Sequence, residues 1–421
     1  MIKILKSLPL LLLGLQLSAT AQSNIPKWQE GNLDVLIFKT GHGDAIFTIM
    51  PDGTTMLTDP GELDLSDQRT WSPRNSAAYP NASKFADQWI ADYIEQINPN
   101  KDKQQVDYAF ITHFHDDHYG MVYPGARKST QGDYLLSGIT GVGERIQFNT
   151  LVDRGFPNYT VPFDLATYLQ KNNIKEYKTL VNYQTYLKAQ QAKGMNVEGF
   201  KVGQRNQFKL KHQADKYPRF SIQNISGNGY YWDSKTGKVH YSYPEDGSYI
   251  PSENGVSCGI LIEYNGFKFF HGGDTPGVPS VGAPAYYDME SKIAPSIGSV
   301  DVAIANHHAG RDVLNDQFIR TLQPRVWFQV VWSADQPGPE TLQRLLSPHL
   351  YSGPRDLFAT DILPANRIVL GDIVDRAYKS TDKHLWLQVK GDGSYLVHAL
   401  STQADGLRLE NTFGPYQSKE R

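Results

Sequence analysis

The sequence predicts an α/β protein whose sheets are covered by helices, and three observations support that class. Short apolar runs bounded by turn residues, such as Leu33 to Phe38 and Val106 to Thr112, are typical of buried strands. Between these runs lie amphipathic segments; over residues 82–98 apolar side chains recur at helical spacing until Asn98-Pro99 ends the pattern. Several strands lead at their C-terminal ends directly into polar residues, and such strands with helices between them indicate helix-covered sheets.

Turn signals separate the expected elements along the chain. Pro51-Asp52-Gly53-Thr54 and Asn265-Gly266 each predict a hairpin turn, and Gly391-Asp392-Gly393 joins a terminal hairpin. The expected strands are residues 33–38, 45–50, 55–58, 106–112, 220–225, 256–264, 267–271, 300–305, 326–331, 386–389 and 395–399. The expected helices are residues 82–98, 163–171, 175–193, 315–322 and 339–346. A loop is expected at 62–81, and a long loop or a hairpin at 226–255.

Composition narrows the classes of function. The chain has 421 residues, of which 40% are hydrophobic and 20% charged, so it can bury a large core. Its formal net charge is −3 and no block of like charges stands out, whereas proteins that bind long nucleic acid usually carry a basic patch. We therefore expect a small-molecule or short polymeric substrate and no stable nucleic-acid complex, and the oligomeric state stays open. Cys258 is the only cysteine, which excludes an intrachain disulfide.

The N-terminus has the features of a secretory signal peptide. Lys3 and Lys6 precede an apolar run from Leu8 to Leu17, and Ala19-Thr20-Ala21 is a small-residue cleavage site. The apolar run is too short to span a bilayer, and no cysteine follows the cleavage site, so we expect no membrane anchor. Cleavage after residues 1–21 would yield a periplasmic or secreted protein.

The segment His113-Phe114-His115-Asp116-Asp117-His118 carries the strongest chemical signal. With 12 His in the chain, three His and one Asp at fixed offsets arise by chance on the order of once in 10⁶ starting points. Imidazole and carboxylate are ligands that zinc prefers. His113 and His115 can face one metal, while Asp117 and His118 face a second. Two cations held roughly 3.5–4 Å apart polarise an ester oxygen and generate hydroxide near neutral pH. Asp116 lies between the ligands and is expected to be a solvated acid.

The pattern His-x-His-x-Asp-His after a strand resembles the metal motif of the metallo-β-lactamase superfamily. Other stretches are similar to the branch typified by the hydrolase domain of the ComEC DNA-uptake channel, and the resemblance covers about 33–346 with gaps. It implies an αββα sandwich that forms one catalytic domain over residues 22–421, with an insertion at about 121–218 and a C-terminal extension at about 350–421. The stretches that carry the branch resemblance are Gly41-His42-Gly43-Asp44-Ala45, Pro51-Asp52-Gly53, Leu57-Thr58-Asp59-Pro60-Gly61, Asn254-Gly255-Val256-Ser257, Gly273-Asp274-Thr275 and Asp301 to His308.

The resemblance also implies further members of the site. Asp274 corresponds to the aspartate that bridges both metals. Of the paired His307-His308, His307 is expected to complete the second metal and His308 to face the charge that develops on the substrate. Residues expected to support the ligands from behind are Asp59, Asp44, Asn254 and Ser257, with Asp59 orienting a ligand imidazole.

The chain departs from the family pattern between the first cluster and Asp274. Many members have another His ligand there, but the window holds only His212, His240 and His271, and none has a convincing context. The Asn254 and Ser257 element stands in that place, so the first metal is expected to have fewer protein ligands.

Two departures follow the paired histidines and concern the substrate. Ala309, Gly310 and Arg311 replace the usual Gly-Ser, and Gln336 rather than a His precedes Pro337. Arg311 suits bidentate recognition of phosphate or carboxylate. The alternative, about equally supported, is that Arg311 is a solvated loop residue.

These features together predict an exported hydrolase that uses a zinc-bound hydroxide, with two zinc ions expected per chain and manganese or iron left open. The branch and Arg311 favour a phosphodiester-type substrate, and Asp117, His308 and Arg311 are the expected catalytic residues. The alternatives are a carboxyl ester, lactone or β-lactam hydrolase and a catalytically silent metal- or ligand-binding module. The insertion is expected to border the cleft with Tyr123, Tyr159, Tyr183 and Tyr186.

Overall fold

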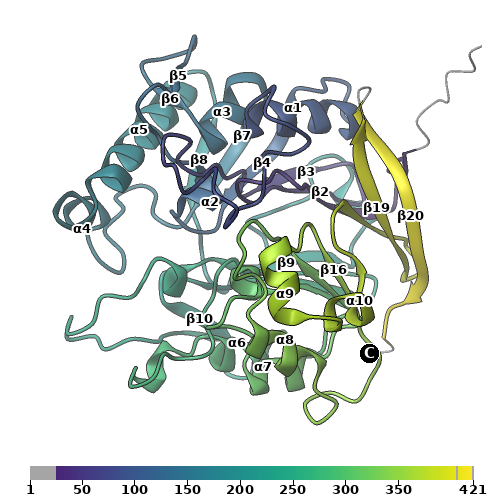
Figure 1. Ribbon diagram of the computed structural model, residues 1–421. Coiled ribbons are helices and arrows are strands. Elements are labelled where there is room, and N and C mark those ends of the chain that lie inside the picture. Colours follow the sequence, from purple (N-terminus) through teal and green to yellow (C-terminus); the bar gives the residue numbers. More distant parts are fainter. Residues whose placement is uncertain (1–24, 404–405, 420–421) are drawn as a thin grey trace, which may run out of the picture.

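The computed structural model describes residues 25–403 and 406–419, so the expected signal peptide lies outside the described residues (Figure 1). In that part of the chain the strands form two nine-stranded sheets and a small two-stranded one. The first sheet contains, in spatial order, β20 (Gly406–Gln417), β19 (Ser394–Gln403), β18 (His384–Val389), β1 (Leu33–Ile37), β2 (Ile46–Ile49), β3 (Thr55–Thr58), β4 (Gln105–Ile111), β7 (Gln147–Asp153) and β8 (Asn196–Gly199). The second contains β11 (Lys238–Tyr241), β10 (Tyr230–Asp233), β9 (Phe220–Gly227), β12 (Gly259–Tyr264), β13 (Phe267–His271), β14 (Val302–Ile304), β15 (Val326–Gln329), β16 (Asp356–Ala359) and β17 (Tyr378–Ser380). The small sheet pairs β5 (Arg127–Lys128) with β6 (Leu135–Leu136).

Helices lie on the outer face of each large sheet (Figure 1). On the side of the first sheet are α1 (Ala86–Ile97), α2 (Asp116–Tyr119), α3 (Gly138–Arg145), α4 (Leu165–Asn172) and α5 (Ile174–Gln191). On the side of the second are α6 (Glu290–Ile297), α7 (Asp316–Leu322), α8 (Pro339–Leu346), α9 (Pro364–Leu370) and α10 (Ile373–Ala377).

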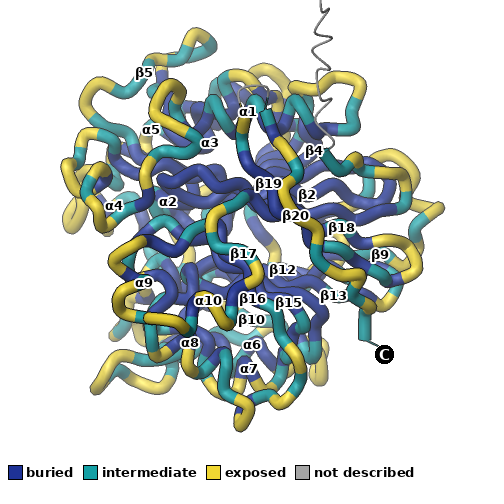
Figure 2. Tube along the Cα trace, turned by 45° about the vertical axis from the view of Figure 1, so that its right-hand side comes forward, coloured by how far each residue is buried: buried dark blue, intermediate teal, exposed yellow. Residues whose placement is uncertain are grey.

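Three buried apolar clusters show the four layers. Leu36 of β1 packs in a cluster with Ile90 and other residues of the helices that cover the first sheet. Its neighbours Val35 and Ile37 point the other way and pack in a second cluster, shared with strands of the second sheet. A third cluster lies between the second sheet and helices α6 to α8. These layers confirm the predicted αββα sandwich. In Figure 2 most strands lie in the buried interior and most exposed segments are loops, whereas the edge strand β20 is largely exposed.

Parallel strands in each sheet position the candidate site. β3, β4, β7 and β8 are parallel neighbours in the first sheet, and β13 to β17 are parallel neighbours in the second. Because parallel strands end at the same edge of a sheet, the residues that follow them are brought together. Asp59 follows β3, His113 follows β4, Asp274 follows β13 and His308 follows β14.

The segments expected as an insertion and an extension are integral to the sheets. Residues 121–218 supply β7 and β8 to the first sheet and the covering helices α3 and α5. Residues 350–421 supply five strands, β16 to β20, and β18 pairs along the whole of β1. The pairing of β18 with β1 joins residues more than 300 positions apart, so local sequence patterns could not reveal it.

Three of the four tyrosines expected at the cleft lie in the core instead. Tyr159, Tyr183 and Tyr186 are buried in the apolar cluster between the first sheet and its helices. Tyr159 and Tyr183 both donate hydrogen bonds of 2.9 Å to Asp153 Oδ2. Of the four, Tyr123 lines two pockets, and Tyr159 borders another through the part of its side chain that is not packed in the core. Among helices of the described residues, none combines the length and hydropathy of a membrane span.

Candidate metal centre

The His-rich segment forms a compact turn at the C-terminal end of β4. His115 precedes the first residue of α2, and Asp117 and His118 lie within that short helix. Two loops hold α2 by its backbone: Asp44 N donates to Asp117 O at 2.8 Å, and Glu62 N donates to Asp116 O at 2.9 Å. Gly61 passes so close that a Cβ there would lie 1.8 Å from Asp117 O, so this position requires glycine.

The structure brings the predicted ligands together in two groups that share one residue. The first group is His113, His115 and Asp274. The second is Asp117, His118, Asp274 and His308. Within each group the potential ligand atoms all lie within 4.8 Å of one another. Asp274 therefore occupies the place expected of an aspartate between two cations.

His307 and His308 lie in places opposite to those expected from the sequence. His308 is 3% exposed, belongs to the second group and has its Nε2 2.9 Å from Asp117 Oδ2. The side chain of His307 is 32% exposed and its Nε2 lies 3.8 Å from Asp274 Oδ2, outside both groups. Its Nδ1 is bonded to Asp312 Oδ1 at 2.6 Å.

The backbone explains this exchange. His307, His308 and Ala309 have φ angles of 43°, 53° and 60°, in the left-handed region that L-residues rarely adopt. Three consecutive left-handed residues turn adjacent side chains to different sides of the chain. This conformation is imposed by tertiary contacts, so residue order alone did not show which imidazole faces the cluster.

Asp59 supports one histidine of each group. Its Oδ2 accepts from His118 Nδ1 at 3.0 Å and from Thr112 Oγ1 at 2.6 Å. Because the Thr112 hydroxyl proton is donated to Asp59, its oxygen accepts from His113 Nδ1, which lies 3.0 Å away. Both imidazoles therefore hold a proton on Nδ1 and direct Nε2 to the centre, which is the nitrogen that could bind a metal.

The other expected supporting residues also lie around the cluster. Asp44 Oδ1 is 3.4 Å from His308 Nδ1, which also donates to the carbonyl oxygen of Val330 at 3.0 Å. Ser257 Oγ accepts from Asp274 N at 3.2 Å. Asn254 Nδ2 lies 3.2 Å from His307 Nε2 and so contacts the exposed histidine rather than a member of either group.

Several expected alternatives lie outside both groups. His212 and His240 are paired with Asp107 and Asp233 at 3.6 and 3.8 Å. His271 is buried, with its Nε2 4.0 Å from Asp59 Oδ2. Arg311 is exposed and forms no hydrogen bond or ion pair within the described part of the chain.

The structure adds residues that the sequence did not single out. Glu253 Oε1 accepts from Phe114 N at 2.9 Å, inside the His-rich segment. Arg154 clamps the same carboxylate through hydrogen bonds of 2.6 and 2.7 Å from a nearly fully buried guanidinium. Trp332 Nε1 donates to Asp117 Oδ2 at 2.9 Å. Trp332 follows β15 at its C-terminal end, a signal that could have identified it, whereas nothing local in the sequence pairs Arg154 with Glu253.

Glu290 holds the loop that carries the paired histidines. The carboxylate is fully buried on α6 and accepts from Asn306 Nδ2 at 2.8 Å and from Leu314 N at 2.9 Å. Its second oxygen accepts from Asn315 N at 2.8 Å. One carboxylate thus fixes both ends of the segment 306–315.

The charges of the cluster fit a bound cation. Burial alone would lower the pKa of His118, but the carboxylates of Asp274 and Asp117 raise it well above the usual range. Burial would likewise lower the pKa of His308, but Asp44 and Asp274 raise it to about 9. The cluster therefore attracts positive charge strongly, and His118 Nε2 is buried there without a hydrogen-bond partner. Nitrogen and carboxylate donors in this arrangement suit a divalent transition metal, which would occupy the place of these protons.

Comparisons with known proteins found no match in sequence and only weak similarity in structure. No protein-family model matches the chain, and no curated protein matches it. Among solved structures, the chain is similar to a candidate Zn-dependent hydrolase of the metallo-β-lactamase superfamily from Thermotoga maritima. The identity is 11%, the match covers 78% of this chain and 74% of that one, and the TM-score is 0.25. Human tRNase Z, short form, is similar at 13% identity, with 77% and 91% coverage and a TM-score of 0.29. Likenesses at such TM-scores carry no inference about function.

Proposed function

We propose that the protein is a metal-dependent hydrolase of the metallo-β-lactamase superfamily, of the branch typified by the ComEC hydrolase domain. The observation that supports this most is the single carboxylate of Asp274 shared by two groups of potential ligands. Zinc is the proposed metal, with one ion in each group. When bound, two such cations polarise a substrate oxygen and lower the pKa of a water molecule.

The residues of the chain would position and orient these cations. His113 and His115 would hold the first, and Asp117, His118 and His308 the second, with Asp274 between them. Asp59 and the Val330 carbonyl keep protons on the outer nitrogens of the imidazoles. The Trp332 indole donates to one Asp117 oxygen and so fixes the orientation of that carboxylate.

His307 is the residue of this set that faces outward toward a substrate. Burial lowers its pKa, but Asp274 and Asp312 raise it above the usual value. Asp312 also fixes the ring by its hydrogen bond to Nδ1. A positively charged or proton-donating imidazole at this place would stabilise negative charge that develops on the substrate.

We further propose that the substrate of this hydrolase is a phosphodiester-type compound. Arg311 lies three residues beyond His308 and its guanidinium has no partner in the described chain, so it is free to bind an anionic group. The alternatives are a carboxyl ester, lactone or β-lactam, and a catalytically silent binding module. The purified protein should be analysed for metal and assayed with a chromogenic phosphodiester, a lactone and nitrocefin. Fully metallated protein that hydrolyses none of them would favour the silent module.

We predict different effects on metal content and activity when His307 and His308 are each replaced by alanine. His308→Ala is expected to lose about one metal ion per chain, because it removes a donor of the second group. His307→Ala is expected to keep its metal content and to lose activity, roughly 10²-fold, because it removes a charge-stabilising group. Elemental analysis and turnover of both variants check this. Loss of metal from the His307 variant alone would restore the assignment expected from the sequence.

We also propose that the protein is exported after cleavage near Ala21, into the periplasm or the medium. The charged start, the apolar run and the Ala-Thr-Ala site support this. N-terminal sequencing of the mature protein tests it, and an intact Met1 in the cytoplasm would contradict it.

A further inference from the structure

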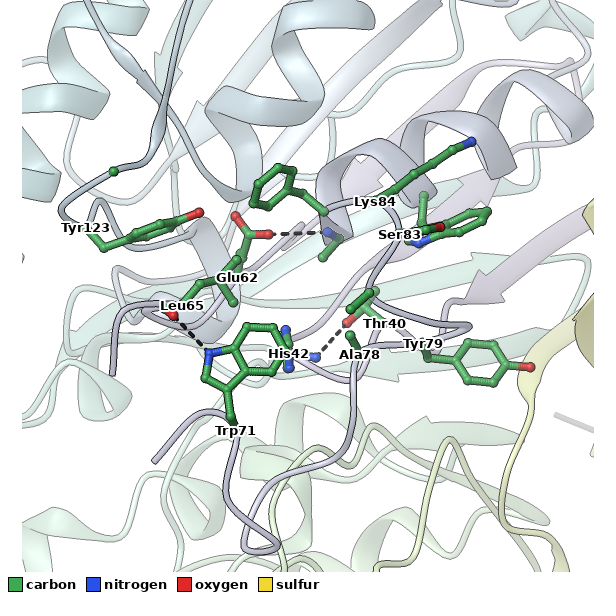
Figure 3. A pocket seen from close by; sticks show the side chains of 15 residues that line it. Thr40, His42, Glu62, Leu65, Trp71, Ala78, Tyr79, Ser83, Lys84 and Tyr123 are labelled. Atoms are coloured by element: carbon green, nitrogen blue, oxygen red, sulfur yellow. Dashed lines mark hydrogen bonds between the residues drawn. The ribbon is translucent and has the colours of Figure 1, made fainter. Parts of the chain in front are cut away.

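A pocket with a volume of about 240 Å³ lies next to α1 and contains none of the candidate metal ligands (Figure 3). Three segments line it: the loop after β1, the long connection from β3 to α1, and the loop after α2. Its walls are rich in aromatic side chains, namely Trp71, Tyr79, Phe85, Trp89 and Tyr123. Such walls are typical of pockets that bind small organic molecules.

The Trp71 indole is held in place although half of it is exposed. Its Nε1 donates to the carbonyl oxygen of Leu65 at 2.9 Å, which fixes the ring orientation. The ring lies edge-on to the imidazole of His42, with centroids 5.1 Å apart and an angle of 89° between the planes (Figure 3). A fixed and exposed tryptophan at a pocket offers a preformed apolar surface to a ligand.

Two buried polar groups in the lining lack partners. His42 is 3% exposed, and its Nε2 has no hydrogen-bond partner. Glu62 is fully buried; one carboxyl oxygen accepts from Ala86 N at 3.3 Å, and the other, Oε2, has no partner. Both atoms are closed off from the open space of the pocket, so the lining offers a ligand apolar contact rather than these polar atoms.

The lining carries little net charge near neutral pH. Burial lowers the pKa of His42 to about 4 and raises that of Glu62 to about 8, so both side chains are mainly neutral there. Lys84 lies over the Trp89 ring and is already paired with Asp92. Behind Glu62, Asp87 is neutralised by a bidentate pair with Arg127. A charged ligand would lose its hydration here without gaining a free counter-charge.

We propose that this pocket binds a small uncharged aromatic molecule. Its ring would pack against Trp71 and the aromatic neighbours of Trp71. This site is additional to the proposed hydrolytic centre. It shares two loops with that centre, because the backbone at Asp44 and Glu62 bonds to α2.

Titration calorimetry of the mature protein with benzamide, phenol and benzoate tests the proposal. Benzamide and phenol are expected to bind saturably at one site, with benzamide at least about tenfold tighter than its charged analogue benzoate, because the pocket cannot compensate a buried charge. Saturable binding by neither neutral probe, or equal binding of benzamide and benzoate, would overturn the proposal.

Substitutions of single residues test whether benzamide binds in this pocket. Trp71→Ala is expected to weaken benzamide binding at least about tenfold, whereas Trp232→Ala, a partly exposed tryptophan on β10, should leave it unchanged. Thermal unfolding identifies variants that fail to fold, and perturbation of the Trp71 resonance by benzamide in the unsubstituted protein then provides the same localisation. Unchanged affinity in a folded Trp71→Ala protein, or no shift of that resonance, would contradict the proposed site.

Discussion

Asp274→Ala is expected to lose both metal ions and to reduce hydrolysis at least about 10³-fold. The reason is geometric, because Asp274 is the one residue shared by both groups of potential ligands. Removing it withdraws a donor from each cation and leaves two incomplete sites. Two bound cations contribute several kcal/mol of charge stabilisation, and each 1.4 kcal/mol corresponds to about tenfold in rate.

Elemental analysis of the purified variant, together with turnover of whichever substrate the wild type hydrolyses, measures this effect. Asp274→Asn keeps the shape but removes the charge, so it separates loss of the carboxylate from simple loss of packing. Asp392→Ala, on an exposed hairpin turn, is the control for a lost carboxylate and should retain full metal content. Full occupancy of both sites in Asp274→Ala would show that this residue does not bridge the metals.

His118→Ala tests whether one metal site can be weakened separately from the other. His118 belongs to the second group only, so the first site should be spared more than the second. A uniform loss from both sites would show that they are occupied only together.

Arg311→Ala is expected to reduce phosphodiester turnover roughly 10²-fold while the metal content stays unchanged. The transition state of phosphodiester hydrolysis carries more negative charge than that of a neutral ester or lactam, so a cation beyond the metals matters more. Arg311 is exposed and has no hydrogen-bond or ion-pair partner in the described chain, so the substitution removes a charge without breaking a polar contact there. Lactone or nitrocefin turnover should be weak and barely affected.

The matched control is Arg408→Ala, because Arg408 is also exposed but lies on the edge strand β20. Initial rates with a chromogenic phosphodiester and a lactone, measured for both variants at equal metal content, give the comparison. Robust lactone or lactam hydrolysis with phosphodiesters untouched would assign the protein to the alternative substrate class. An equal loss in both variants would show a general effect of surface charge.

The part of the candidate site whose residues are contiguous in the chain could be predicted from the sequence. His113 to His118 are contiguous and follow a strand, so one turn and one short helix suffice to bring their side chains together. Asp59 and Asp274 were predicted from the family resemblance, and each lies shortly after a strand at an edge where parallel strands end. The same reasoning from strand ends applies to Trp332, which was not singled out.

The layered α/β class, most of the strands and the contiguous metal motif were predictable from residue order, because hydrophobic periodicity and short spacings are local properties. Which of His307 and His308 faces the cluster depends on the folded chain, because three successive residues there adopt left-handed φ angles. The tertiary structure also decided that β18 completes the first sheet beside β1 and that Arg154 clamps Glu253 behind Phe114. These contacts join residues distant in the chain, and their partners are selected by packing and burial across the whole fold rather than by any local pattern.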